Sequence, residues 1–248
     1  LYPILKPIVR AIWRGAETVV AKCEREADMN RAIDGRTSIS LVPNGVYLDA
    51  FPPGPPIPDE GPLRLLCVAR LIQRKGQRHL IEAVRALVNA GIEITLDLVG
   101  TGDARPAYEA QVRELGLDGH VNFLGYVPRA EIAQHYASAH VFVLPSYNEG
   151  MSVATLEAMA AGLPVVVTRT GGTAELVEEG VNGSAFDWAD VDELAQHLFL
   201  LTTDRDRARA MGQASQARAA LFTWEAATDR YLEMYTTRAQ RNGQRGTA

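Results

Sequence analysis

From residue 63 onward, short apolar runs alternate with longer amphipathic stretches. The short runs fit strands buried on both faces, and the stretches with apolar residues every three or four positions fit helices. We expect strands at 63–69, 94–99, 121–124, 141–144 and 165–168, and helices at 77–90, 107–115, 129–137 and after Gly150. Repeated strand–helix units predict an α/β fold with a Rossmann-like parallel sheet and helices on both faces.

The flanking segments follow other patterns. Residues 1–14 have helical spacing, although Pro3 and Pro7 leave the first turns undecided. A short strand at 18–21 and a helix at 24–32 come next, and residues 38–42 lead into the turn signal Pro43-Asn44-Gly45. At the other end we expect a short strand after Gly183, a loose tail over 242–248, and helices at 191–201, 205–221 and 224–238.

Proline and glycine dominate residues 52–62, which predicts a linker of polyproline character and a new domain after it. The 248 residues suffice for one large domain or one and a half smaller ones. A net charge of −5 does not fit a nucleic-acid-binding protein.

The cysteines and histidines indicate whether the chain holds disulfides or a metal site. Two cysteines, Cys23 and Cys67, do not make a disulfide framework, which favours the cytoplasm. None of the five histidines has metal-ligand spacing, so we expect no metal.

No apolar run reaches the roughly 18 residues of a membrane span. The first residue is Leu, so we expect the chain to begin partway through a longer protein.

Residues able to bind a ligand follow each expected strand. Ligands of open parallel sheets bind outside the carboxyl ends of the strands, so these loops should converge on one crevice. In chain order the loops carry Arg70 and Lys75, then Gly100 and Gly102, then Tyr126 and Val127, then residues 146–151, and finally Gly171, Gly172 and Glu175.

The first three loops suggest contacts to a nucleotide. Arg70 and Lys75 together could hold a diphosphate, although either cation alone is more often a solvated surface charge. The Gly100-Thr-Gly102 segment lacks the third glycine of a dinucleotide fingerprint, so it is either a tight turn or a close approach of backbone to ligand. Tyr126 and Val127 either contact a base ring or form a plain turn before Pro128.

Two carboxylates, Glu149 and Glu157, flank the start of the helix after Gly150. A helix start offers free N–H groups and a positive dipole end for a phosphate, while carboxylates accept hydrogen bonds from hydroxyls. Eight positions place the two carboxylates about 80° apart on a helix, so we assign different targets. Glu149 would meet a sugar and Glu157 a ribose; the alternative for Glu157 is a solvated helix residue.

These motifs resemble those of the C-terminal half of a GT-B glycosyltransferase of the retaining family 4. Their order and spacing agree over about two thirds of the chain. The motifs are Ala69-Arg70-Leu71-x3-Lys75-Gly76, Val99-Gly100-x-Gly102, Phe123-Leu-Gly-Tyr-Val127, Pro145-Ser146-x2-Glu149-Gly150, Ala158-Met-Ala-x-Gly162-x-Pro164-Val-Val and Gly171-Gly172-x2-Glu175.

The resemblance implies a role for each site residue. Arg70 and Lys75 would bind the donor diphosphate, and Glu149 would contact hydroxyls of the donor sugar. The loop at Tyr126 and Val127 would contact the nucleobase and Glu157 the ribose, while the amides of Gly150, Met151 and Ser152 would face the sugar and phosphate.

The resemblance also divides the chain. Residues 1–51 resemble a remnant of the N-terminal, acceptor-side α/β domain with its hinge, residues 61–222 the nucleotide-sugar-binding domain, and residues 223–240 a crossover helix.

The chain departs from the family motifs at three places. Glu149-Gly150-Met151-Ser152 replaces Glu-Gly-Phe-Gly, which leaves the sugar specificity open; Tyr47 replaces an Asp; and Lys22-Cys23-Glu24 replaces Val-Ser-Glu.

The resemblance implies transfer of a sugar, with retained configuration, from a nucleotide diphosphate sugar to a carbohydrate, lipid or small-molecule acceptor. No metal or other cofactor is expected, because the cations replace one, and the chain alone should be poorly active without the rest of its first domain. A non-catalytic nucleotide-binding fragment and a GT-B phosphorylase or epimerase are the alternatives.

Residues 1–14 are basic and amphipathic, which suits packing on the missing domain better than peripheral membrane contact.

Overall fold

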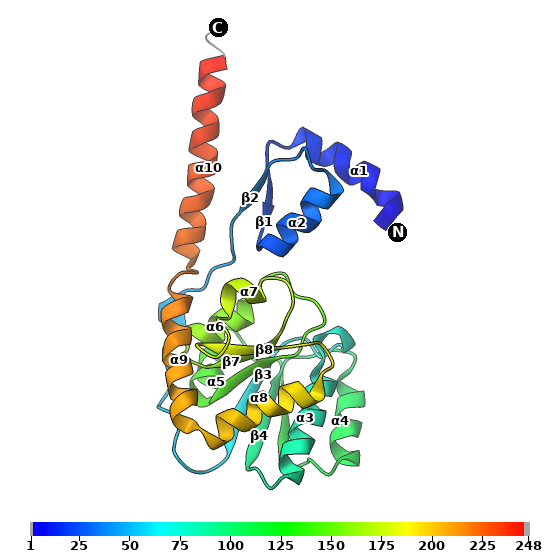
Figure 1. Cartoon of the computed structure of the whole chain (residues 1–248), viewed down its shortest axis with the longest axis vertical. Coiled ribbons are helices and arrows are strands. Elements are labelled where there is room, and N and C mark those ends of the chain that lie inside the picture. Colours follow the sequence, from blue (N-terminus) through cyan, green and yellow to red (C-terminus); the bar gives the residue numbers. More distant parts are fainter. Residues whose placement is uncertain (1, 246–248) are drawn as a thin grey trace.

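The structure, a computed structural model, describes the backbone of residues 2–245 and the side chains of residues 4–237. Within these residues, six parallel strands form one sheet in the order β5-β4-β3-β6-β7-β8 (Figure 1). This confirms the predicted parallel α/β sheet. The strands are β3 (Leu63–Val68), β4 (Ile94–Val99), β5 (Val121–Gly125), β6 (Val141–Leu144), β7 (Val165–Thr168) and β8 (Gly183–Phe186).

Helices cover both faces of the sheet, as expected. One face carries α3 (Gln77–Asn89), α4 (Arg105–Glu114) and α8 (Val191–Thr203), which pack against one another (Figure 1). Right-handed crossovers place α5 (Ile132–Ser138) and α6 (Val153–Ala160) on the other face, where α9 (Arg205–Ala219) packs on α6. Short turns complete this unit: η1 (Leu48–Ala50), η2 (Gln73–Lys75) and α7 (Thr173–Leu176).

The core lies between the sheet and these helices. β6 and β7 are buried along their whole length, which explains their unbroken apolar sequences. In α3, buried Leu80, Ile81, Val84 and Leu87 form one stripe at helical spacing. Cys67 is buried within β3, and both cysteines are free thiols.

The direction of the crossovers reverses between β3 and β6. From β3 the chain moves outward to β4 and β5, then α5 carries it back to β6, and from there it continues to β7 and β8. Because the chain leaves the carboxyl ends of β3 and β6 toward opposite faces, these ends form the topological switch point, outside which open parallel sheets have their ligand crevice. The loops after these two strands therefore hold the residues best placed to bind a ligand.

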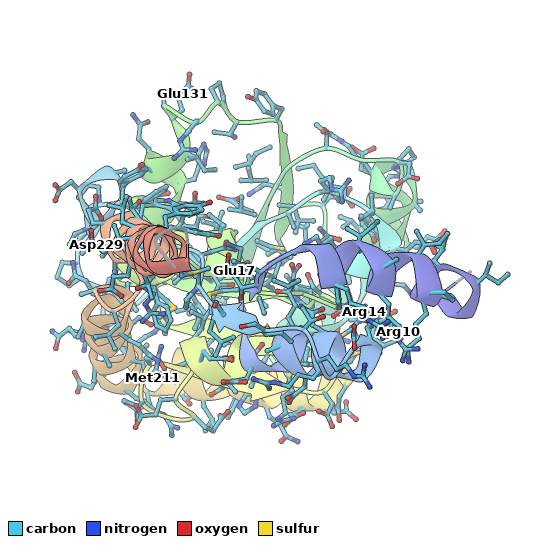
Figure 2. All side chains as sticks on the ribbon, turned by 90° about the horizontal axis from the view of Figure 1, so that it is seen from above. Arg10, Arg14, Glu17, Glu131, Met211 and Asp229 are labelled. Atoms are coloured by element: carbon cyan, nitrogen blue, oxygen red, sulfur yellow. The ribbon has the colours of Figure 1, made fainter. Side chains whose placement is uncertain are left out.

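Residues 2–41 form a small second unit above the carboxyl edge of the sheet (Figure 1). It contains α1 (Tyr2–Gly15), α2 (Glu24–Ile33) and a two-stranded parallel sheet of β1 (Val19–Ala21) and β2 (Ile39–Leu41). On α1, Arg10 donates to the Ile33 carbonyl and Arg14 pairs with Asp34 at 3.0 Å, so both cations hold the end of α2 (Figure 2). The residues of 1–14 that the structure describes are helical despite Pro7.

Two chain segments cross between the units side by side. The Val46 amide donates to the Phe222 carbonyl at 2.9 Å, and a side chain at Gly45 would collide with the backbone of Thr223 and Trp224. After this crossing, α10 (Trp224–Arg245) rises beside the small unit (Figure 1). The expected loose tail over 242–248 was wrong up to Arg245, because α10 continues through Asn242 and Gly243 in spite of their low helix propensity; the last three residues lie outside the described part.

Two further expectations need correction. The helix expected at 129–137 begins at Ile132, because residues 129–131 form a turn in which the Glu131 amide bonds to the Pro128 carbonyl at 2.9 Å. Residues 52–62 contain neither helix nor strand, as expected, yet they pack on the sheet unit instead of spanning open solvent. Ile57 is buried there, and a side chain at Gly54 would collide with the backbone of Ala137.

A buried histidine, His140, precedes β6, and its Nδ1 accepts the Arg64 amide at 3.1 Å. Burial lowers the pKa of His140 from 6.5 to about 4. Between pH 6.5 and about 4, this histidine is protonated in the unfolded chain but neutral in the folded chain. The free energy of unfolding therefore falls as the pH falls through this window. We expect the His140→Gln variant to lose less stability over this window, by up to about 1.4 kcal/mol per pH unit.

Urea unfolding of both proteins at several pH values measures this difference. Identical slopes of unfolding free energy against pH would contradict a neutral, buried His140.

Candidate functional site

Two charged side chains meet across the crevice between β3 and β6. Lys75 ends η2 after β3, Glu149 lies in the loop after β6, and the Lys75 ammonium donates to a Glu149 carboxylate oxygen. Their side chains are only 16% and 20% exposed. The sequence placed both at the carboxyl edge of the sheet, and the structure brings them into direct contact.

Backbone packing fixes the two loops that carry this pair. Gly76, at φ 71°, follows Lys75, and a side chain there would collide with the Pro145 carbonyl oxygen. The Tyr147 amide donates to the Arg74 carbonyl at 2.8 Å. These contacts hold the loops after β3 and β6 against each other, so the relative position of Lys75 and Glu149 is set by main chain.

Arg70 lies at the same edge, directly after β3, with an exposed side chain. Its carbonyl accepts a hydrogen bond of 2.9 Å from Gln77, whose side chain is fully buried in α3. Among the residues that the structure describes, the Arg70 guanidinium forms no ion pair. The backbone of Arg70 is thus fixed while its charge stays available to an anion.

The start of α6 completes this side of the crevice. Ser152 is the N-cap residue, and its hydroxyl accepts the Thr155 amide at 3.2 Å. The positive end of the α6 dipole therefore lies next to Gly150 and Met151 in the chain. Gly150 is exposed and Met151 is buried.

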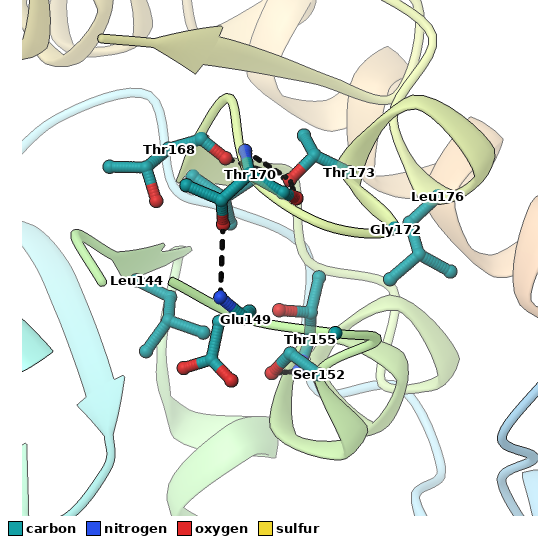
Figure 3. Close-up of a pocket in the computed structure, with 11 residues that line it drawn as sticks. Leu144, Glu149, Ser152, Thr155, Thr168, Thr170, Gly172, Thr173 and Leu176 are labelled. Carbon is teal, nitrogen blue, oxygen red and sulfur yellow. Dashed lines mark hydrogen bonds between the residues drawn. The ribbon is translucent and has the colours of Figure 1, made fainter. Parts of the chain in front are cut away.

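A pocket lies between the loop after β6 and the loop after β7. Glu149, Ser152 and Thr155 face Thr168, Thr170 and Thr173 across it (Figure 3). Of the residues that the sequence singled out, the pocket takes in Glu149, Gly150, Ser152 and Gly172; the others lie outside it. The threonines from the β7 side were missed, because an isolated hydroxyl carries little signal in a sequence.

The β7 loop holds Glu149 through its backbone. The Glu149 amide donates to the Thr170 hydroxyl at 3.3 Å, and the Gly172 amide donates to the Gly150 carbonyl. A side chain at Gly171 would overlap the Glu149 carbonyl. The Gly171-Gly172 pair that the sequence singled out therefore allows two loops to lie in backbone contact.

Glu157 has a buried partner on α5. Its carboxylate accepts the hydroxyl of Tyr136 at 2.9 Å, and Tyr136 is fully buried. Burial raises the pKa of Glu157, against the opposing effects of the Tyr136 bond and of Arg129. The alternative reading of Glu157 as a freely solvated residue is wrong. Glu149 and Glu157 thus have different protein partners, and their assignment to a sugar and a ribose stays a prediction.

Gly100 and Gly102 have a structural reason to be glycine. Gly100 has φ 132°, and a side chain there would collide with the Ala69 carbonyl. A side chain at Gly102 would collide with the backbone of Leu71, whose amide bonds to the Thr101 carbonyl at 2.9 Å. Both glycines let the loops after β3 and β4 pack closely, and a ligand role for either stays a prediction.

The loop after β5 presents two different surfaces. Tyr126 is 76% exposed, whereas Val127 packs against the core. The base contact predicted for this loop stays a prediction.

Other reactive groups nearby do not add a nucleophile or a metal site. Burial raises the pKa of the Cys67 thiol to about 12, so this thiol is protonated at neutral pH. Among the described side chains of residues 4–237, no three His, Cys, Asp or Glu gather as a metal site requires. The same part of the chain contains no helix that is both long and apolar enough to cross a membrane.

Comparison with known sequences shows the family of the chain. The family described as "Glycosyl transferases group 1" matches residues 54–218. A GDP-mannose-dependent alpha-(1-6)-phosphatidylinositol monomannoside mannosyltransferase of Mycobacterium tuberculosis is 31% identical over 87% of this chain and 60% of its own length. A D-inositol 3-phosphate glycosyltransferase of Corynebacterium jeikeium is 32% identical over 89% of this chain and 57% of its own length.

Solved structures extend the likeness to the small unit and the crossing. Sucrose-phosphate synthase from Thermosynechococcus elongatus superimposes with a TM-score of 0.86 at 28% identity, over 95% of this chain and 62% of its own. The Anabaena protein HepE, solved with UDP and glucose, gives 0.84 at 25% identity, over 94% and 66%.

The chain thus spans about 60% of the length of the curated relatives it matches. The family match covers all six strands of the large sheet and also Arg70, Lys75, Glu149 and Glu157. On this ground, the chain belongs to the group 1 family of glycosyl transferases.

Proposed function

We propose that this chain is the donor-binding part of a retaining glycosyltransferase of family 4, which takes a sugar from a nucleotide diphosphate sugar. The contact between Lys75 and Glu149 carries the proposal. It places one cation for a phosphate and one carboxylate for sugar hydroxyls side by side, at the switch point where open sheets bind ligands. Arg70 adds a second cation at the same edge.

The chemistry follows from the charges. The oxygen of an acceptor hydroxyl forms a bond to the anomeric carbon, on the face from which the diphosphate leaves, while the bond from that carbon to the diphosphate breaks. The nucleoside diphosphate leaves with the electron pair of the broken bond, so negative charge develops on its oxygen, which takes up the proton of the hydroxyl. Arg70, Lys75 and the N-terminus of α6 would stabilise this charge as it develops. Glu149 and Glu157 serve in binding and not as acid and nucleophile, and the two cations stand in for a metal.

The remaining contacts would orient the nucleotide. Glu157, held by Tyr136, would accept hydrogen bonds from the ribose, and the loop at Tyr126 and Val127 would contact the base. The mannosyltransferase relative is named as dependent on GDP-mannose, and HepE was solved with UDP and glucose. We therefore expect a nucleoside diphosphate hexose as donor.

The acceptor would bind toward the first domain. In the described part of α1, Ile4, Ile8 and Ile12 are exposed on one side. Arg10 and Arg14 are already engaged by the end of α2, so they are poorly placed to bind lipid headgroups. We expect the apolar side of α1 to pack on the rest of the first domain, and a cytoplasmic location stays our prediction.

Donor binding can be tested on this chain directly. A panel of UDP-, GDP- and ADP-sugars should contain one ligand that raises the melting temperature, because a ligand that binds only the folded state stabilises it by mass action. At a hundredfold excess over Kd the gain is about 2.7 kcal/mol. Thermal-shift measurements check this, and a flat response to every nucleotide sugar at millimolar concentration would count against the donor site.

The diphosphate contacts can be tested by removing each cation. In the complete enzyme, Arg70→Ala and Lys75→Ala should each lower kcat/KM by an amount worth about 2–4 kcal/mol, because the charge that develops on the leaving group loses a stabilising cation. Steady-state release of the nucleoside diphosphate is the measurement.

The matched control is Arg78→Ala, which removes an exposed arginine of α3 whose guanidinium pairs with Glu82 at 3.2 Å. It should leave kcat/KM close to the wild-type value. Equal losses in all three variants would show a general effect of charge and not a bound diphosphate.

A further inference from the structure

The loop that carries Glu149 is tied to the crossing segment by a side chain. Asn44 lies in that segment, and its amide nitrogen donates to the Met151 carbonyl at 2.8 Å. The bond joins residues 107 positions apart and is partly buried. Since Gly45 and Val46 are fixed against residues 222–224, Asn44 extends from a rigid base.

A second tie reaches the same region from the small unit. α2 has Cys23 as its N-cap residue without a side-chain capping bond, and its first amide, that of Glu24, donates instead to the Glu175 carboxylate at 2.8 Å. Glu175 lies on α7, so a carboxylate of the sheet unit caps a helix of the small unit. Capping bonds of this kind are also favoured by the helix dipole.

The two ties converge on one backbone network. Gly172 precedes α7, and its amide donates to the Gly150 carbonyl. The Glu175 amide bonds to the Gly172 carbonyl at 3.1 Å. A side chain at Gly172 would sit 3.3 Å from the Cβ atoms of both Cys23 and Met151, so these residues converge on it. Gly150 and Met151 are thereby both linked to residues 23–44.

We propose that Asn44 and Glu175 are positioning residues, which set the loop of Glu149–Ser152 according to where the small unit sits. Asn44 acts on the Met151 carbonyl directly, and Glu175 acts through α7 and Gly172. A movement of residues 23–44 relative to the sheet would pull on both ties at once. In an enzyme with the proposed function, on which this consequence rests, the donor contacts would be complete only when the first domain is seated.

Hydrogen exchange of the ligand-free 248-residue chain tests the positioning. In Asn44→Ala, the protected amides of Gly172 and Thr155 should exchange about five- to tenfold faster, because one hydrogen bond restraining the loop is lost. Amides of β4 should exchange as in the wild type. The matched control, Gln111→Ala, also removes a side-chain amide bond to a main-chain carbonyl, that of Arg78, and should leave both loop amides unchanged.

A pair of variants at Glu175 separates positioning from general damage. Glu175→Gln keeps an oxygen that accepts the Glu24 amide, so exchange at Glu24 and Gly172 should stay near wild type. Glu175→Ala removes the acceptor, and both amides should exchange about five- to tenfold faster. Unchanged loop exchange in both Asn44→Ala and Glu175→Ala would overturn the proposal, as would a uniform rise across the whole sheet.

Nucleotide-sugar affinity, measured on the same variants, distinguishes the two proposals. Faster loop exchange in a chain that binds no donor would support the positioning and contradict the proposed function. Donor binding that is weakened several-fold in Asn44→Ala, together with faster loop exchange, would support both. Donor binding with unchanged loop exchange would contradict the positioning proposal alone.

Discussion

The reversal of crossover direction between β3 and β6 is the constraint on which the site depends. If every crossover ran the same way, each loop at the carboxyl edge would be covered by the next helix. Here α3 leaves β3 toward one face and α6 leaves β6 toward the other, so the two loops stay open and adjacent. A lysine after one strand and a glutamate after the other can then meet, although they are 74 positions apart.

Main-chain packing turns this topology into a defined geometry. Gly76 allows contact with the Pro145 carbonyl, and Gly171 allows contact with the Glu149 carbonyl. Backbone atoms have little conformational freedom once both neighbours are fixed, so Lys75 and Glu149 start from rigid anchors. Such preorganisation would suit the proposed function, because the cations would already be in place when negative charge develops on the leaving diphosphate.

The sequence predicted the strands well because β6 and β7 are buried on both faces. Nearly every residue of such a strand is apolar, so the strand stands out in the sequence as an apolar run with clear ends. It also placed Lys75 and Glu149 at one edge, since parallel strands share their direction. It could not show that the two touch, nor that Glu157 is held by Tyr136, because those contacts depend on how separate loops and helices pack. The extent of α10 was missed for another reason: its last turns are polar, and apolar periodicity does not mark them.

The contact between Lys75 and Glu149 also limits which ligands suit the site. Each group is mostly withdrawn from water, and one hydrogen bond joins them, so the ammonium keeps further donors and the carboxylate keeps a second oxygen. A phosphate alone would use the ammonium donors but bring a second negative charge close to the Glu149 carboxylate. A sugar alone would donate its hydroxyls to the carboxylate but leave the remaining ammonium donors without an anion. A ligand that joins a phosphate to a sugar uses both groups together, so we expect the pair to favour a sugar diphosphate over either part.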